Sequence, residues 1–108
     1  MRLQYILEQL QQFGFTNTQA RLYIAGLELG EVLMKPLAQR ANISRSTAYY
    51  LMEELQRRKF FTIEKIGKRK YYKAASPETL LEMVKKREKL ITSLLPQLQV
   101  ITKNKKDR

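Results

Sequence analysis

Two short runs of side chains in this sequence could do chemistry, and both suit an anionic partner. The first run combines hydroxyl, guanidinium and phenol groups: Ser44, Arg45, Ser46, Thr47, Tyr49 and Tyr50. These groups fall in the first turns of an expected helix, whose N-terminus carries a partial positive charge that suits phosphates and base edges. Arg45 can also donate two hydrogen bonds to a guanine. Because a purely structural helix requires none of these groups, the run predicts contact with nucleic acid. The alternative is a small helical core that binds nothing.

The second run is basic and consists of Lys68, Arg69 and Lys70. It lies between two segments rich in β-branched and aromatic residues, 61–66 and 70–74, with Gly67 at the turn, which predicts a hairpin with a basic tip. Charge runs on turns are often only solvated. Three adjacent cations repel one another, however, and a bound phosphate would relieve that repulsion. We therefore predict that the tip contacts phosphate groups.

Enzymatic chemistry finds little support. The chain has no cysteine and no histidine, which excludes disulfides and zinc sites of the Cys/His type. Glu53 and Glu54 are adjacent on an expected helix and so diverge by about 100°. The sequence also contains no glycine-rich phosphate loop. We expect neither catalysis nor a metal or cofactor.

The charge is distributed unevenly along the 108 residues, whose formal net charge is +11. Residues 1–56 hold five basic and five acidic side chains, so the surplus lies in residues 57–108, with sixteen basic against five acidic. A basic surplus indicates a polyanionic partner or surface. No apolar run reaches the roughly 18 residues of a membrane helix, and no signal segment opens the chain. We expect a cytoplasmic, nucleoid-associated protein.

The elements that must position the two runs follow from periodicity and capping residues. Helices are expected over 3–13, from Thr16 to Gly30, from near Pro36 to Asn42, and over 44–59, with Ser44 as a cap. Residues 32–33 could add a short strand beside the hairpin. This order is a helix-turn-helix followed by a wing, a shape that places one helix in the DNA major groove. The fold class expected is mainly α with a small β-hairpin (α+β), with residues 1–75 as the DNA-binding domain.

A long helix over residues 76–103 is expected after this domain. Its apolar side chains repeat every three or four residues, which is typical of a coiled-coil seam with one charged interruption. The seam residues are Leu80, Val84, Arg87, Ile91, Leu94 and Leu98. A helix of about 25 residues is nearly 40 Å long, more than a domain this small can cover, so we predict a homodimer rather than a helix folded back on its own domain. Pro96 predicts a kink or break, and residues 104–108 are expected to be a frayed basic tail.

Three segments resemble the N-terminal winged-helix domain of TrmB-type transcriptional regulators. They read FTNTQARLYIAGLELG, LAQRANISRSTAYYLMEEL and IGKRKYYKAASPETLLE, and the resemblance covers residues 3–90. It implies dimers on palindromic operator DNA, base-reading positions at 45–47 and 49, and a wing at 67–70. The sequence departs from the family at two turns, where Asn42 and Phe60 replace the usual glycines.

Many members of this family carry a large sugar-binding domain after the long helix, at the point where these 108 residues stop. The chain is then either the DNA-binding part of a longer regulator or a naturally short form. The function expected is sequence-specific binding of double-stranded DNA in transcriptional control. The rivals are a winged-helix module for an acidic protein partner and a nucleoid-type binder with little sequence preference. The polar groups at 45–47 favour specific DNA reading over both.

Overall fold

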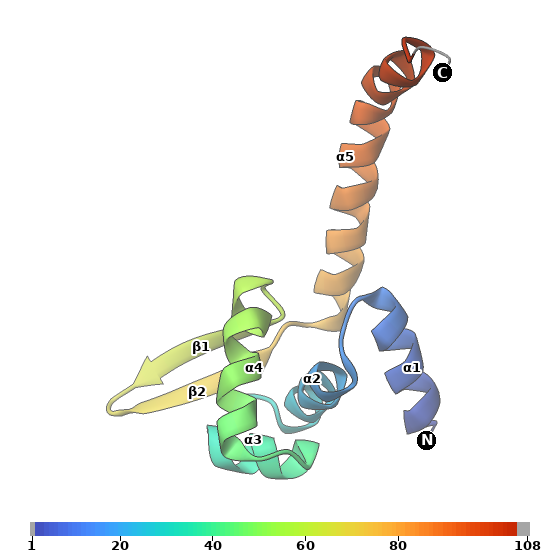
Figure 1. Ribbon diagram of the computed structural model, residues 1–108. Helices are drawn as coiled ribbons and strands as arrows, with labels where there is room; N and C mark the ends of the chain where they lie inside the picture. Colours follow the sequence, from blue (N-terminus) through green and yellow to red (C-terminus); the bar gives the residue numbers. More distant parts are fainter. Residues whose placement is uncertain (1, 106–108) are drawn as a thin grey trace. The chain divides into compact units, whose positions relative to one another are not determined.

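The computed structural model describes residues 2–105, which form five helices and one antiparallel hairpin (Figure 1). The elements are α1 (Leu3–Phe13), α2 (Asn17–Leu29), α3 (Met34–Ala41), α4 (Arg45–Arg57), β1 (Phe61–Ile66), β2 (Arg69–Ala74) and α5 (Pro77–Lys103). The chain divides into two compact units, the first ending at Ser76 and the second beginning at Pro77. The expected fold class, helices with one small hairpin, is confirmed.

Capping residues define the helix ends as the sequence predicts. The Thr16 hydroxyl accepts a hydrogen bond from the Gln19 N–H at 3.2 Å, and the Gln19 side chain accepts one from the Thr16 N–H at 2.9 Å. The Ser44 hydroxyl accepts from the Thr47 N–H at 3.1 Å and starts α4. Asn42 ends α3 in the left-handed conformation, with φ 59°, which asparagine tolerates better than most residues.

Three predicted boundaries were wrong. Helix α3 begins at Met34 rather than near Pro36, because the first N–H groups of a helix have no acceptor within it and a proline in its first turn loses nothing. Helix α4 ends at Arg57 rather than at residue 59, since Lys59 adopts a positive φ of 69° that a right-handed helix cannot contain. Strand β2 begins at Arg69, one residue early.

The core of the first unit surrounds α2, which contacts α1, α3, α4 and β2. Aromatic rings fill the space beside it. The Phe15 ring lies 5.3 Å from that of Tyr23 and 4.5 Å from that of Phe60, measured between centroids. At Gly26 the hairpin approaches closely, and a Cβ built there would lie 2.8 Å from Cζ of Phe61.

The hairpin is the wing, and its base is fixed to the segment before α3. The two strands pair from Phe61 with Ala74 to Ile66 with Arg69. Val32 adds a single bridge to β2, with the Tyr72 N–H donating to the Val32 carbonyl at 2.7 Å and the Val32 N–H donating to the Tyr72 carbonyl at 3.0 Å. The short strand expected at residues 32–33 is thus present only as this bridge.

Helix α5 contains 27 residues and none of them is buried. It continues through Pro96, so a break there was a wrong prediction, although the ribbon changes direction in its last turns (Figure 1). Large exposed apolar side chains occur along it: Leu81, Val84, Leu90, Ile91, Leu95, Leu98, Val100 and Ile101. Within residues 2–105, no helix has the length and apolar character needed to cross a membrane. Of the tail expected at 104–108, residues 106–108 lie outside the described residues.

Candidate nucleic-acid interface

The predicted base-reading residues on α4 are all exposed, whereas Ala48, Met52 and Leu55 on its opposite side are buried. At 100° per residue, Ser46 and Tyr50 lie furthest from the buried side, and Tyr50 is 77% exposed. Arg45, Ser46, Thr47, Tyr49 and Tyr50 therefore offer an open polar surface. Ser44 differs from them, because its hydroxyl caps α4 and donates to the Thr47 hydroxyl at 2.8 Å.

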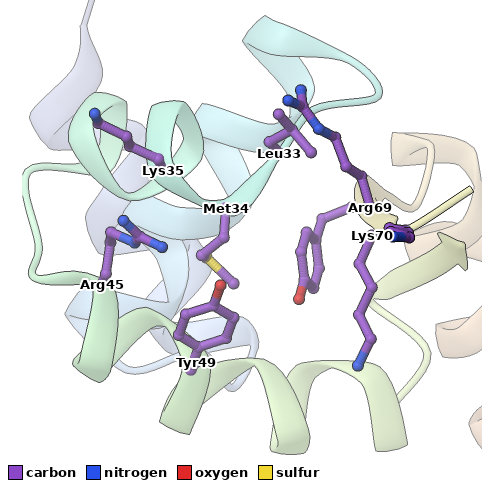
Figure 2. Close-up of a pocket in the computed structure, with 9 residues that line it drawn as sticks. Leu33, Met34, Lys35, Arg45, Tyr49, Arg69 and Lys70 are labelled. Carbon is purple, nitrogen blue, oxygen red and sulfur yellow. The ribbon is translucent and has the colours of Figure 1, made fainter. Parts of the chain in front are cut away.

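A groove of about 530 Å³ separates this surface from the wing. It is lined by Leu33, Met34, Lys35, Arg45, Tyr49, Lys68, Arg69, Lys70 and Tyr72. Figure 2 shows Lys35 and Arg45 on one side, Arg69 and Lys70 on the other, and Met34 and Tyr49 between them. Five of the nine lining residues are cations and none is acidic. Arg45 and Tyr49 of the first run thus meet the whole second run at one basic groove with apolar and aromatic lining, whereas the other members of the first run lie outside it: Ser44, Ser46, Thr47 and Tyr50.

Contrary to the expectation from the sequence, the three basic residues of the wing do not all lie in its turn. Lys68 is in the two-residue turn, whereas Arg69 and Lys70 belong to β2, and all three are exposed. Lys70 pairs directly with Lys65 across the hairpin, and like charges in such a position destabilise a sheet. An anion in the groove would offset that repulsion.

Tyr72 lines the groove and also pairs with the segment before α3. Its backbone forms the bridge to Val32, and its side chain is buried in the groove floor. Burial, with a smaller contribution from neighbouring Tyr49, raises the pKa of Tyr72 above its ordinary value. The phenol is already neutral at physiological pH, and the raised pKa keeps it a hydrogen-bond donor to higher pH.

Sequence reasoning missed Lys35, Met34 and Tyr72 as parts of this groove. Lys35 carried a local signal, because it lies in the first turn of α3, where the partial charge of a helix disfavours a cation. A lysine there indicates that something other than helix stability is served. Tyr72 carried no such signal, because its place depends on the bridge to Val32.

Two arginines fix α3, and with it the turn before α4. Arg21 on α2 donates from Nε to the Ala41 carbonyl at 3.1 Å and from Nη2 to the Asn42 carbonyl at 2.6 Å. Arg40 on α3 donates twice to the Glu28 carboxylate, each time at 2.9 Å. These hydrogen bonds hold the pKa of Glu28 below its usual value. Side chains of α2 therefore hold both α3 and the turn that follows it in position.

The predicted seam residues lie on α5 without burial. Val84, Arg87, Ile91 and Leu98 are exposed, and Leu80 and Leu94 are half-buried. Pairing of this helix with a second copy remains a prediction. Within the described part of the chain, no group of three or more His, Cys, Asp or Glu side chains could hold a metal ion.

Comparison with known proteins gives a family and a fold. The family model of the sugar-specific transcriptional regulator TrmB matches residues 10–78. The HTH-type sugar sensing transcriptional regulator TrmBL1 of Pyrococcus furiosus is 30% identical over 89 residues, which are 82% of this chain and 25% of that protein. The chain thus spans about a quarter of the length of this curated relative.

Solved structures show the same fold at low sequence identity. TrmBL2, an archaeal chromatin protein with a novel mode of DNA binding, superposes with a TM-score of 0.81 at 20% identity, over 95% of this chain and 40% of that one. MepR, a transcription regulator of the Staphylococcus aureus multidrug efflux pump MepA, gives a TM-score of 0.54 at 20% identity, over 94% and 82% of the two chains. The first unit is therefore a winged helix-turn-helix.

Proposed function

Since the chain belongs to the TrmB family of sugar-specific transcriptional regulators, which are not enzymes, we propose that it binds double-stranded DNA sequence-specifically to control transcription. The observation that carries this proposal is the groove, where five cations and no carboxylate line the space between the polar start of α4 and the wing. Such a surface suits a phosphate backbone, whose contacts supply most of the affinity for DNA. A protein with this function acts in the cytoplasm, on the DNA of the nucleoid.

The geometry suggests a division of roles. Helix α4 lies in the major groove with Ser46 and Tyr50 toward the base edges, flanked by Arg45 and Tyr49 on the wing side and by Thr47 on the other. The groove beside it receives one strand of the DNA backbone. Its phosphates contact Lys35 on one side and the wing cations on the other: Lys68, Arg69 and Lys70.

A homodimer formed through α5 completes the proposal. Exposed apolar side chains such as Ile91 and Leu98, 53% and 45% exposed, would be removed from water by a second copy of the helix, at roughly 25 cal/mol per Å² buried. Two recognition helices about one DNA turn apart, ~34 Å, would select a palindromic operator.

Binding-site selection from random duplex DNA with the purified protein tests the proposal. We expect an enriched palindrome. Uniform recovery of duplexes that nevertheless bind would contradict sequence-specific binding and leave a nucleoid-type binder.

The salt dependence of binding tests the wing separately. Replacing Lys68, Arg69 and Lys70 with alanine should reduce the slope of log K against log salt by up to about 3, one for each lost phosphate contact. The matched control removes the same charge from Lys85, Lys86 and Lys89, which lie on α5 away from its apolar side. Equal slopes for the two triple variants would refute a wing in contact with DNA.

A further inference from the structure

Glu53 lies on the exposed side of α4, together with Ser46 and Tyr50. Positions 46, 50 and 53 are four and three residues apart, a spacing that places side chains on one helix face. Glu53 follows Ser46 by seven positions in the helix, which places the two residues about 10 Å apart along the helix axis. A major groove about 12 Å wide admits an α-helix, so a helix lying along it with this face toward the bases would bring both side chains to them.

The Glu53 carboxylate is not used by the fold. Its neighbour Glu54 forms an ion pair with Arg57, but no ion pair or hydrogen bond within residues 2–105 engages Glu53. The side chain is exposed. A free negative charge on the surface that faces a polyanion lowers the affinity for every duplex, unless it finds a donor there.

The major groove offers such a donor at cytosine. Carboxylates accept a hydrogen bond from the cytosine N4 amino group. Guanine presents only acceptors (N7 and O6), thymine presents O4 and a methyl group, and adenine sets its N6 donor beside the N7 acceptor, which repels a second carboxylate oxygen. We propose that Glu53 is a specificity-determining residue that accepts a hydrogen bond from a cytosine in the operator. At the same position it repels guanine and thymine, which present acceptors and no donor. This inference rests on the proposed function, in which α4 lies in the major groove.

The test compares three variants of the full chain by selection from random duplex DNA and by affinity for the selected site and a scrambled duplex. Glu53→Ala removes the acceptor, and Glu53→Gln keeps the shape without the charge. Glu8→Gln on α1, also exposed, is the control for the same change in net charge. Thermal unfolding should be alike in all three, because both glutamates are exposed.

We expect the unmodified chain to require cytosine at one position of its motif. In Glu53→Ala this requirement should disappear, with about a tenfold loss of discrimination at that position. In Glu53→Gln it should shift toward adenine, whose N6 and N7 suit an amide. Both variants should bind the scrambled duplex more tightly than Glu8→Gln does.

Two results would overturn the inference while leaving the proposed function intact. One is an unchanged motif in both Glu53 variants with equally tighter binding to all duplexes, which would make Glu53 only a repulsive charge. The other is binding identical to that of Glu8→Gln, which would place Glu53 outside the interface. The absence of any motif in the unmodified chain would instead overturn the proposed function, and the inference with it.

Discussion

The close approach of the wing to α2 makes Gly26 a sensitive position. Gly26 is in the interior of α2, where replacement of glycine by alanine ordinarily stabilises a helix by about 1 kcal/mol. Here a Cβ would lie 2.8 Å from Cζ and 2.9 Å from Cε1 of Phe61, and 2.9 Å from Cβ of Ala74. Contacts this short require one of the neighbours to move.

Neither neighbour moves easily. The Phe61 ring is 1% exposed and packs edge-on against Tyr23, with ring centroids 6.4 Å apart. The Ala74 Cβ is fixed to the backbone of β2 and has no side-chain torsion that could carry it away. Overpacking of this kind costs about 1–3 kcal/mol. After the gain in helix propensity, we expect Gly26→Ala to lower the free energy of unfolding by up to about 2 kcal/mol.

Thermal denaturation followed by circular dichroism measures this loss, which corresponds to a Tm lower by up to about 16 °C for a domain of this size. A double-mutant cycle with Phe61→Leu isolates the cause, because leucine lacks the ring atoms that meet the new Cβ. Gly26→Ala should cost less in the Phe61→Leu chain than in the unmodified one. If Gly26→Ala stabilises the protein, or costs the same in both chains, the steric argument is wrong.

Three further outcomes follow from other parts of the chain. Ile91→Asp with Leu94→Asp should give a folded monomer with much weaker operator binding, and sedimentation of the unmodified chain as a monomer at tens of micromolar would contradict the dimer. The lowered pKa of Glu28 means that its ion pair stabilises the fold at neutral pH and is lost as the pH falls through that pKa. The small deficit of Glu28→Gln in urea unfolding at pH 7 should therefore shrink once the pH falls below the ordinary glutamate pKa of about 4.3 and vanish only below the lowered pKa of the folded protein; a deficit that persists in stronger acid would refute this. Lys59→Gly should stabilise by about 0.5–1 kcal/mol, since the positive φ of 69° strains any residue with a Cβ, and a loss of stability on chemical denaturation would speak against it.

Local signals made most of the fold predictable from the sequence. The Thr16–Gln19 capping box and the Ser44 cap act over three residues, so their chemistry can be recognised without knowing the tertiary structure. Pro36 and Pro96 were less informative. A proline in a first turn does not fix which residue starts the helix, and α5 continues through its proline.

The groove was only half predictable. The polar run at 44–50 and the basic run at 68–70 are each short segments of sequence, and their charge and hydrogen-bonding groups singled them out. Lys35 and Tyr72 also line the groove. The bridge between Val32 and Tyr72 brings the segment before α3 beside β2, and no local sequence pattern encodes a pairing between segments so far apart in the chain. For the same reason, the sequence alone left the distance between the wing and α4 undetermined.

The Arg21 guanidinium has a consequence for how this protein can diverge. It satisfies the carbonyls of Ala41 and Asn42 from α2, so the turn before α4 is held by a residue on another helix. The exposed side chains at positions 46 and 50 therefore do not have to hold this turn. Substitutions at these two positions should therefore cost little stability, and would not be removed by selection for a folded protein. If these positions read the operator as proposed, a lineage carrying this arginine would change its operator preference one substitution at a time, without first acquiring compensating changes in its core.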